Sequence, residues 1–90
     1  MNNLPEKIKI GGITYTIRFI PDEELSENNN CGKLDRDKDE ILIGESLSLG
    51  NKLLSFLHEM VHAINGELEE EEVESIAVGL HQVLVDNELL

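Results

Sequence analysis

Apolar and polar residues alternate through the first half of the chain, which is the pattern of half-buried β-strands. Residues 7–10 and 13–20 show it most clearly, and the Gly11-Gly12 pair between them suits a tight hairpin turn because glycine accepts positive φ angles. Residues 32–34 and 40–43 predict a second hairpin that turns through a charged run. We therefore expect four short strands in one sheet.

The second half of the chain changes to the spacing of amphipathic helices. One helix is expected from about residue 50 to 65, with Ser48 as N-cap and Gly66 in the left-handed position that ends many helices. The order of elements predicts a single α+β domain over residues 1–90, in which two β-hairpins form one sheet and both helices cover one face of it. The second helix is expected from about 69 to 87, on an apolar stripe of Val73, Ile76, Ala77, Leu80, Val83 and Leu84.

The composition limits the classes of function. The chain has 19 acidic and 7 basic residues, a net charge of −12, which argues against binding to nucleic acid or to anionic membrane surfaces. It contains no apolar run of about twenty residues that would span a membrane, and its first residues lack the basic and apolar regions of a signal peptide. With a single cysteine, Cys31, no internal disulfide can form. These features together favour a cytoplasmic protein.

The first expected helix contains the sequence H-E-x-x-H, formed by His58, Glu59 and His62. Histidines four residues apart lie one turn apart on the same helix face, so both imidazoles can reach one tetrahedral zinc ion. Glu59 is then the expected general base toward a water molecule on the metal. Apolar neighbours indicate a buried helix, where a metal accounts for such polar groups. The alternative is a helix with two ordinary histidines, since the motif alone is a hypothesis.

A catalytic zinc site normally has three protein ligands and a water molecule, so a third ligand is required. The second expected helix begins with a run of glutamates. At 100° per residue, Glu69 falls within the apolar stripe and Glu70 and Glu72 fall on its two edges, whereas Glu71 and Glu74 point away. This geometry leaves Glu69, Glu70 and Glu72 as candidates.

The H-E-x-x-H motif, together with the segment from Glu72 to Leu80, resembles the ImmA/IrrE family of metallopeptidases, in particular its short, phage-type members. These are gluzincins, in which H-E-x-x-H is joined by a glutamate from the next helix in a motif of the form E-A-x-x-F-A-x-x-L. Setting Ile76-Ala77 on the F-A of that motif implies that Glu72 is the third ligand of Zn²⁺. The chain departs from the pattern at Val73-Glu74, and it lacks the helix before the sheet and the C-terminal domain of longer members.

The resemblance implies a zinc-dependent metallopeptidase that hydrolyses a peptide bond through a metal-activated water, with Glu59 as general base. Its substrate would be a peptide or a protein such as a repressor, bound along the edge strand beside the motif helix, which the resemblance identifies as residues 40–44. Tyr15 and His81 are the candidates for stabilising the oxyanion, although Tyr15 also suits the core and His81 lies opposite Glu72 on its helix. The alternatives are a catalytically silent zincin-like module of phage or prophage type that binds metal or protein, and a metal-free interaction protein.

Three further segments are expected to carry no chemistry. Residues 21–30 are polar and predict an exposed loop with one helical turn near its start. Aspartates alternate between residues 35 and 39 as in a calcium-binding EF-hand, but Glu40 stands where that loop needs glycine. Cys31 is expected to be an ordinary loop cysteine rather than a nucleophile or a zinc ligand.

Overall fold

A computed structural model describes residues 4–25 and 31–89 of the chain. It contains a four-stranded sheet followed by two helices, which confirms the predicted α+β layout. A short 3₁₀ helix, η1 (Asp22–Glu24), forms the helical turn predicted after the second strand; residues 26–30 of the predicted loop lie outside the described residues. The strands are β1 (Lys7–Ile10), β2 (Ile13–Ile20), β3 (Gly32–Asp35) and β4 (Glu40–Gly44), and the helices are α1 (Leu49–Ile64) and α2 (Glu70–Asp86).

The two hairpins join into one sheet through a parallel pair of strands. β1 and β2 are antiparallel around the glycine turn, in which Gly11 has a φ of 64°, and β3 and β4 are antiparallel around the turn from Asp35 to Glu40. β2 then pairs parallel with β4, so the strand order is β1-β2-β4-β3. This order places β4 inside the sheet and β3 at its edge.

The edge strand beside the motif helix is therefore β3, and the identification of residues 40–44 as that strand is wrong. β4 has a neighbour on each side, and its Ile41 and Ile43 are fully buried, as expected of a central strand. β3 has the features of an edge, because it is short and carries the exposed Lys33. Both β3 and β4 contact α1, so the two strands differ in their position in the sheet and not in their contact with the motif helix.

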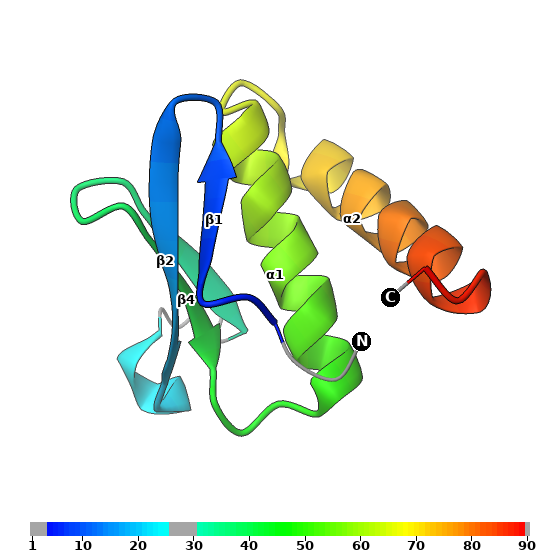
Figure 1. Ribbon diagram of the computed structural model, residues 1–90, viewed down its shortest axis with the longest axis horizontal. Coiled ribbons are helices and arrows are strands. Elements are labelled where there is room, and N and C mark those ends of the chain that lie inside the picture. Colours follow the sequence, from blue (N-terminus) through cyan, green and yellow to red (C-terminus); the bar gives the residue numbers. More distant parts are fainter. Residues whose placement is uncertain (1–3, 26–30, 90) are drawn as a thin grey trace.

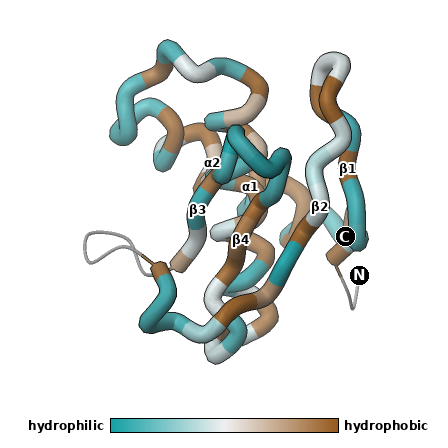
Figure 2. Tube along the Cα trace, turned by 90° about the vertical axis from the view of Figure 1, so that its left-hand side faces the viewer, coloured by the Kyte–Doolittle hydropathy of each residue, from teal (hydrophilic) through white to brown (hydrophobic). Residues whose placement is uncertain are grey.

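The molecule is built in three layers, namely the sheet, α1 and α2 (Figure 1). α1 packs across the sheet, mainly against β3 and β4, and α2 packs against α1. Hydropathy along the chain follows this arrangement, since β4 is hydrophobic and the turn that joins β3 to β4 is hydrophilic (Figure 2). The core between the layers consists of Tyr15, Ile17, Ile41, Ile43, Phe56, Leu57 and Ala77.

The ends of the helices follow local side-chain chemistry. Ser48 caps α1 as predicted, because its hydroxyl accepts a backbone N–H of the first turn at 3.2 Å. At the start of α2, Glu69 and Glu72 form a capping box, in which each side chain accepts the backbone N–H of the other residue. The predicted left-handed stop at Gly66 is wrong: α1 ends at Ile64, its C-cap Asn65 has an extended conformation, and Gly66 does not have a positive φ.

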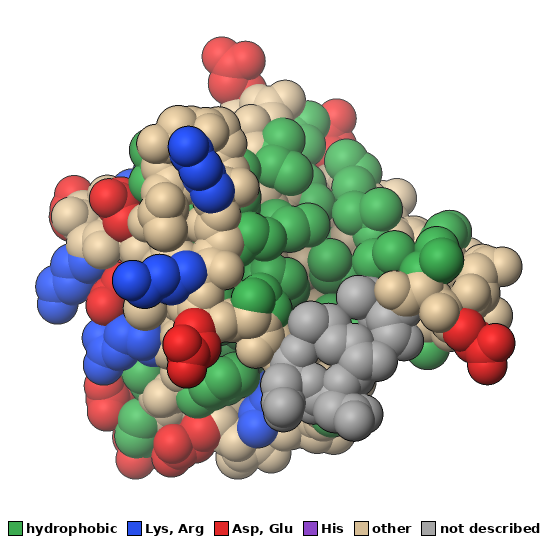
Figure 3. All heavy atoms as spheres, in the orientation of Figure 1, with side chains coloured by type: hydrophobic (Ala, Val, Ile, Leu, Met, Phe, Trp, Pro, Cys, Tyr) green, Lys and Arg blue, Asp and Glu red, His purple; other side chains and the backbone are tan. Residues whose placement is uncertain are grey.

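α1 covers only one side of α2. Val73 and Ala77 of α2 are fully buried, and Figure 3 shows hydrophobic side chains on the surface between the sheet and α2. The apolar residues of α2 that are more than a third exposed are Ile76, Val78, Leu80, Val83 and Val85.

Within the two described stretches of chain, neither helix is long and apolar enough to cross a membrane.

Candidate metal centre

The two histidines of α1 meet a glutamate from the start of α2. His58 and His62 lie one turn apart, with ring centroids 4.9 Å from each other. Nε2 of His58 is 3.3 Å from Oε1 of Glu70, and Nε2 of His62 contacts the same oxygen. Among the described residues, His58, His62 and Glu70 form a group whose ligand atoms all lie within 4.8 Å of one another. Such a group can hold a metal ion.

The separation of one pair of these atoms, His58 Nε2 and Glu70 Oε1, matches the value for a tetrahedral zinc ion. Zinc binds imidazole nitrogen and carboxylate oxygen at about 2.0–2.2 Å, so two ligand atoms on a tetrahedron lie about 3.3 Å apart. The separation of His58 Nε2 from Glu70 Oε1 is 3.3 Å. Two histidines and one glutamate also form a ligand set that catalytic zinc takes, with a fourth position left for water or substrate. Both the distance and the donor types therefore suit zinc.

Glu70 keeps its negative charge in this position. Partial burial raises the pKa of the Glu70 carboxyl, but hydrogen bonding with His62 and His58, and the charge of these imidazoles, outweigh burial and lower the pKa overall. A carboxyl group must be deprotonated to bind a metal. The surroundings of Glu70 therefore favour the form that acts as a ligand.

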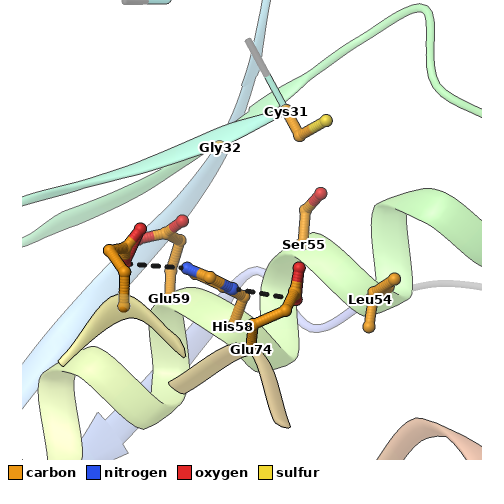
Figure 4. A pocket seen from close by; sticks show the side chains of 8 residues that line it. Cys31, Gly32, Leu54, Ser55, His58, Glu59 and Glu74 are labelled. Carbon is orange, nitrogen blue, oxygen red and sulfur yellow. Dashed lines mark hydrogen bonds and ion pairs between the residues drawn. The ribbon is translucent and has the colours of Figure 1, made fainter. Parts of the chain in front are cut away.

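A second glutamate of α2 contacts the other ring nitrogen of His58. Oε1 of Glu74 is 3.3 Å from Nδ1 of His58 (Figure 4). Glu70 and Glu74 are four residues apart, as His58 and His62 are, so one turn of α2 faces one turn of α1. A carboxylate at Nδ1 holds the imidazole in the tautomer whose Nε2 is free to bind a metal. Glu74 was expected to point away from the site, although its four-residue spacing from Glu70 matches that of His58 and His62 and could have indicated this contact.

Replacing Glu74 by Ala is expected to weaken zinc binding by about 10- to 100-fold, because His58 loses the carboxylate that orients its ring. Titration with zinc against a competing chelator measures the change. Glu71→Ala is the matched control, since Glu71 is an exposed glutamate in the first turn of α2, one turn or less from Glu74, and forms no hydrogen bond or ion pair with the histidines. Equal zinc affinity in the two variants would show that Glu74 does not orient His58.

Glu59 lies beside the metal group without belonging to it. Its side chain lies on the β3 side of α1, where Oε2 is 3.4 Å from the position that a Cβ on Gly32 would take. Only 4% of Glu59 is exposed, and this burial raises its pKa; the charges of His58 and His62 act in the opposite direction, and that of Glu70 reinforces the rise. A carboxyl group with a raised pKa next to a metal group suits a general base.

The structure differs from the prediction at the third ligand. Glu72 turns toward the N-terminus of α2, where its carboxylate accepts the N–H of Glu69 at 2.9 Å. Glu69 is occupied by the same capping box, so Glu70 alone of the three candidates reaches the histidines. The physical reason is the helical rotation, because residues 70 and 72 point about 200° apart and cannot both face α1.

Two cavities adjoin the metal group and meet at Glu59. The first, of about 290 Å³, lies between β3 and the two helices, and Ser55 and Leu54 of α1 form part of its wall (Figure 4). The second, of about 400 Å³, lies further along β3, beside His62. Gly32 and Glu59 line both cavities, so the two follow the edge strand past the expected base.

The other candidate residues contribute nothing to this group. Tyr15 is 2% exposed within the core, and His81 lies about 16 Å along the α2 axis from Glu70. Neither residue lines a cavity at Glu59, so neither can stabilise an oxyanion there. Asp35 instead shapes its turn, because its Oδ1 accepts two backbone N–H groups at 3.0 and 3.1 Å. Cys31 lines the first cavity but is not a member of the metal group.

Comparison with known proteins does not identify a family for this chain. The chain matches no protein-family model, no curated protein and no solved structure. A function for this chain can therefore be proposed only from the sequence motif and the geometry of the site.

Proposed function

We propose that the protein is a zinc-dependent metallopeptidase in which His58, His62 and Glu70 hold the metal and Glu59 is the general base. One observation carries this proposal. One ligand atom from each of His58, His62 and Glu70 lies within 4.8 Å of the other two, and the buried side chain of Glu59 lies next to them. Structural zinc sites usually have four protein ligands, whereas three ligands with an adjacent carboxylate are typical of a hydrolytic site.

In this proposal each residue has a distinct role. Zinc, when bound, would act as a Lewis acid toward a water molecule and toward the carbonyl of the scissile peptide bond. Glu59 takes a proton from the attacking water and returns it to the leaving amine. Glu74 holds His58 in position through Nδ1, and Glu70 supplies the negative charge among the ligands. The roles of Glu59 and Glu70 are therefore separable by experiment.

The proposed substrate is a peptide or an extended protein segment. β3 is an edge strand, so its outer backbone groups are available to pair with an added strand, which would pass the two cavities and Glu59. Within this proposal the chain is a cytoplasmic ImmA/IrrE-like gluzincin of phage type, and a repressor is a candidate substrate. The chain's strong negative charge makes nucleic acid an unsuitable ligand.

The second candidate is a zincin-like module that binds metal or a protein partner without cleaving it. The exposed apolar side chains of α2 favour this candidate, since a helix with one free apolar side is a common binding surface. The two candidates make the same prediction for metal and opposite predictions for hydrolysis. The intact Glu59 favours the peptidase, because binding alone does not require a base.

Elemental analysis of protein purified without a metal-affinity tag tests the metal site. We expect about one zinc per chain, and His58→Ala or His62→Ala should remove it. Chelation should also lower the melting temperature, because a metal held by both helices stabilises the folded state. Full zinc occupancy in either histidine variant, or an unchanged melting curve after verified metal removal, would contradict the site. Cleavage of fluorescently labelled casein by the zinc form then separates the peptidase from the silent module.

A further inference from the structure

The second cavity brings two cations beside the expected base. We call it the Arg36 pocket, and define it by its lining residues, which are Gly32, Lys33, Leu34, Arg36, Glu59, His62 and Gly66. Its volume is about 400 Å³, and Glu59 and His62 form the wall that it shares with the metal centre. A group bound in this pocket would therefore lie next to the reacting bond of a peptide held at Glu59.

Arg36 is fixed at the pocket without being neutralised. Its Nη2 donates a hydrogen bond of 2.8 Å to the backbone carbonyl of His62, in the last turn of α1. Gly66 leaves room for this contact, because a Cβ there would lie 3.1 Å from Nη2. Arginine has five N–H donors, and the bond to a neutral carbonyl uses one of them. The guanidinium therefore keeps both its charge and free donor positions.

Lys33 and Arg36 are not paired with any carboxylate among residues 4–25 and 31–89. Arg18 has Glu40 as an ion-pair partner at 3.2 Å, whereas neither Lys33 nor Arg36 forms an ion pair with any residue in the described stretches. The position of these two cations is unusual because most of the chain is acidic. Every lysine and arginine lies at or before Lys52, and the rest of the chain carries only acidic charges. An acidic ligand would be repelled by most of this protein and attracted at the Arg36 pocket.

We infer that the Arg36 pocket is a specificity subsite for a carboxylate side chain, Asp or Glu, close to the scissile bond of the peptide. This inference rests on the proposed function, because a peptide must lie along β3 for its side chain to reach the pocket. Arg36 binds the carboxylate through its remaining donors, and Lys33 adds a second positive charge from the edge strand. The groove at Glu59 therefore discriminates among peptides by charge.

Peptide binding to the zinc-loaded Glu59→Gln variant tests the subsite without cleavage. The probes are fluorescein-labelled alanine-rich hexapeptides with one Asp at each position in turn, matched to peptides with Asn at the same position. At one position, the Asp peptide should bind about tenfold or more tightly than the Asn peptide by fluorescence anisotropy. Arg36→Gln should bring this ratio close to one, and Lys33→Gln should lower it.

Lys38→Gln is the matched control, since Lys38 is an exposed cation of the β3–β4 turn that lines neither cavity, and the ratio should not change. Lys33→Gln also covers the case in which Arg36→Gln fails to fold, because Lys33 is an exposed side chain on an edge strand. The inference is overturned if no peptide binds, if no position prefers Asp, or if the preference survives both pocket variants. Because the assay measures binding, a protein that binds the peptides but cleaves none would contradict the proposed peptidase and leave the subsite standing.

Discussion

Replacing Glu70 by Gln is expected to weaken zinc binding by about two orders of magnitude or more. Disturbing groups that only orient a ligand already costs about 10- to 100-fold in affinity, and Glu70 is a ligand in the proposed site. Glutamine has nearly the same shape but replaces the charged oxygen that contacts both histidines by a neutral amide. The fold should survive, because the side chain of Glu70 is 66% exposed.

Glu72→Gln is the matched control, and it should bind zinc like the parent. It lies two residues away in the same first turn, and glutamine can still accept the backbone N–H of Glu69 in the capping box. Both variants are titrated with zinc against a competing chelator, with circular dichroism to confirm the helices. If Glu72→Gln lost the metal while Glu70→Gln kept it, the register implied by the family motif would be correct and the proposed ligand set would not.

Most of the fold could be predicted from the sequence because its elements are specified locally. The alternation of apolar and polar residues predicted β1 and β2 at their observed bounds, and Ser48 predicted the start of α1. The H-E-x-x-H motif likewise needs only one helix to bring its histidines together, so local geometry was sufficient for His58 and His62. These predictions required no knowledge of how the elements pack.

The identity of the glutamate that meets His58 and His62 depends on how α2 is rotated against α1, and no local pattern in the sequence predicts that rotation. The predicted core stripe of α2 included Ile76, Leu80 and Val83, which are 42%, 36% and 46% exposed in the structure. Without them, the buried direction, defined by Val73 and Ala77, moves by about 40° around the helix axis. This rotation brings Glu70 and Glu74 toward the histidines and turns Glu72 away. The predicted buried direction of α2 was therefore wrong because it counted exposed apolar residues as part of the core.

The remaining errors also concern contacts between distant parts of the chain. The family resemblance identified residues 40–44 as the edge strand, whereas the parallel pairing of β2 with β4 makes β4 central, and neither strand alone carries a signal of that pairing. Gly66 was interpreted as a left-handed helix stop, but the structure uses its missing side chain to admit the guanidinium of Arg36, thirty residues earlier in the chain. In both cases the error concerns a contact between segments far apart in the chain, which the local sequence does not predict.

Replacing Glu59 by Gln is expected to abolish peptidase activity while leaving zinc bound. General acid–base catalysis contributes about 10²- to 10⁴-fold to a rate, and glutamine cannot take a proton from water. Zinc should stay because Glu59 is not a member of the His58, His62 and Glu70 group. The fold should also stay, because glutamine has almost the same volume and removes a charge from a position that is only 4% exposed.

Three measurements on Glu59→Gln, beside Glu70→Gln, separate a base from a ligand. Zinc content by elemental analysis should equal that of the parent in Glu59→Gln and fall in Glu70→Gln. Cleavage of labelled casein should be lost in both variants, and the melting temperature with zinc should fall only in Glu70→Gln, since bound metal stabilises the fold. Loss of zinc from Glu59→Gln would place this carboxylate among the ligands, and retained cleavage would remove it from the chemistry. Glu59 lies on α1 with its side chain toward β3, whereas Glu70 reaches the histidines from α2. Different outcomes for zinc together with the same outcome for cleavage would therefore show that the two glutamates have different roles.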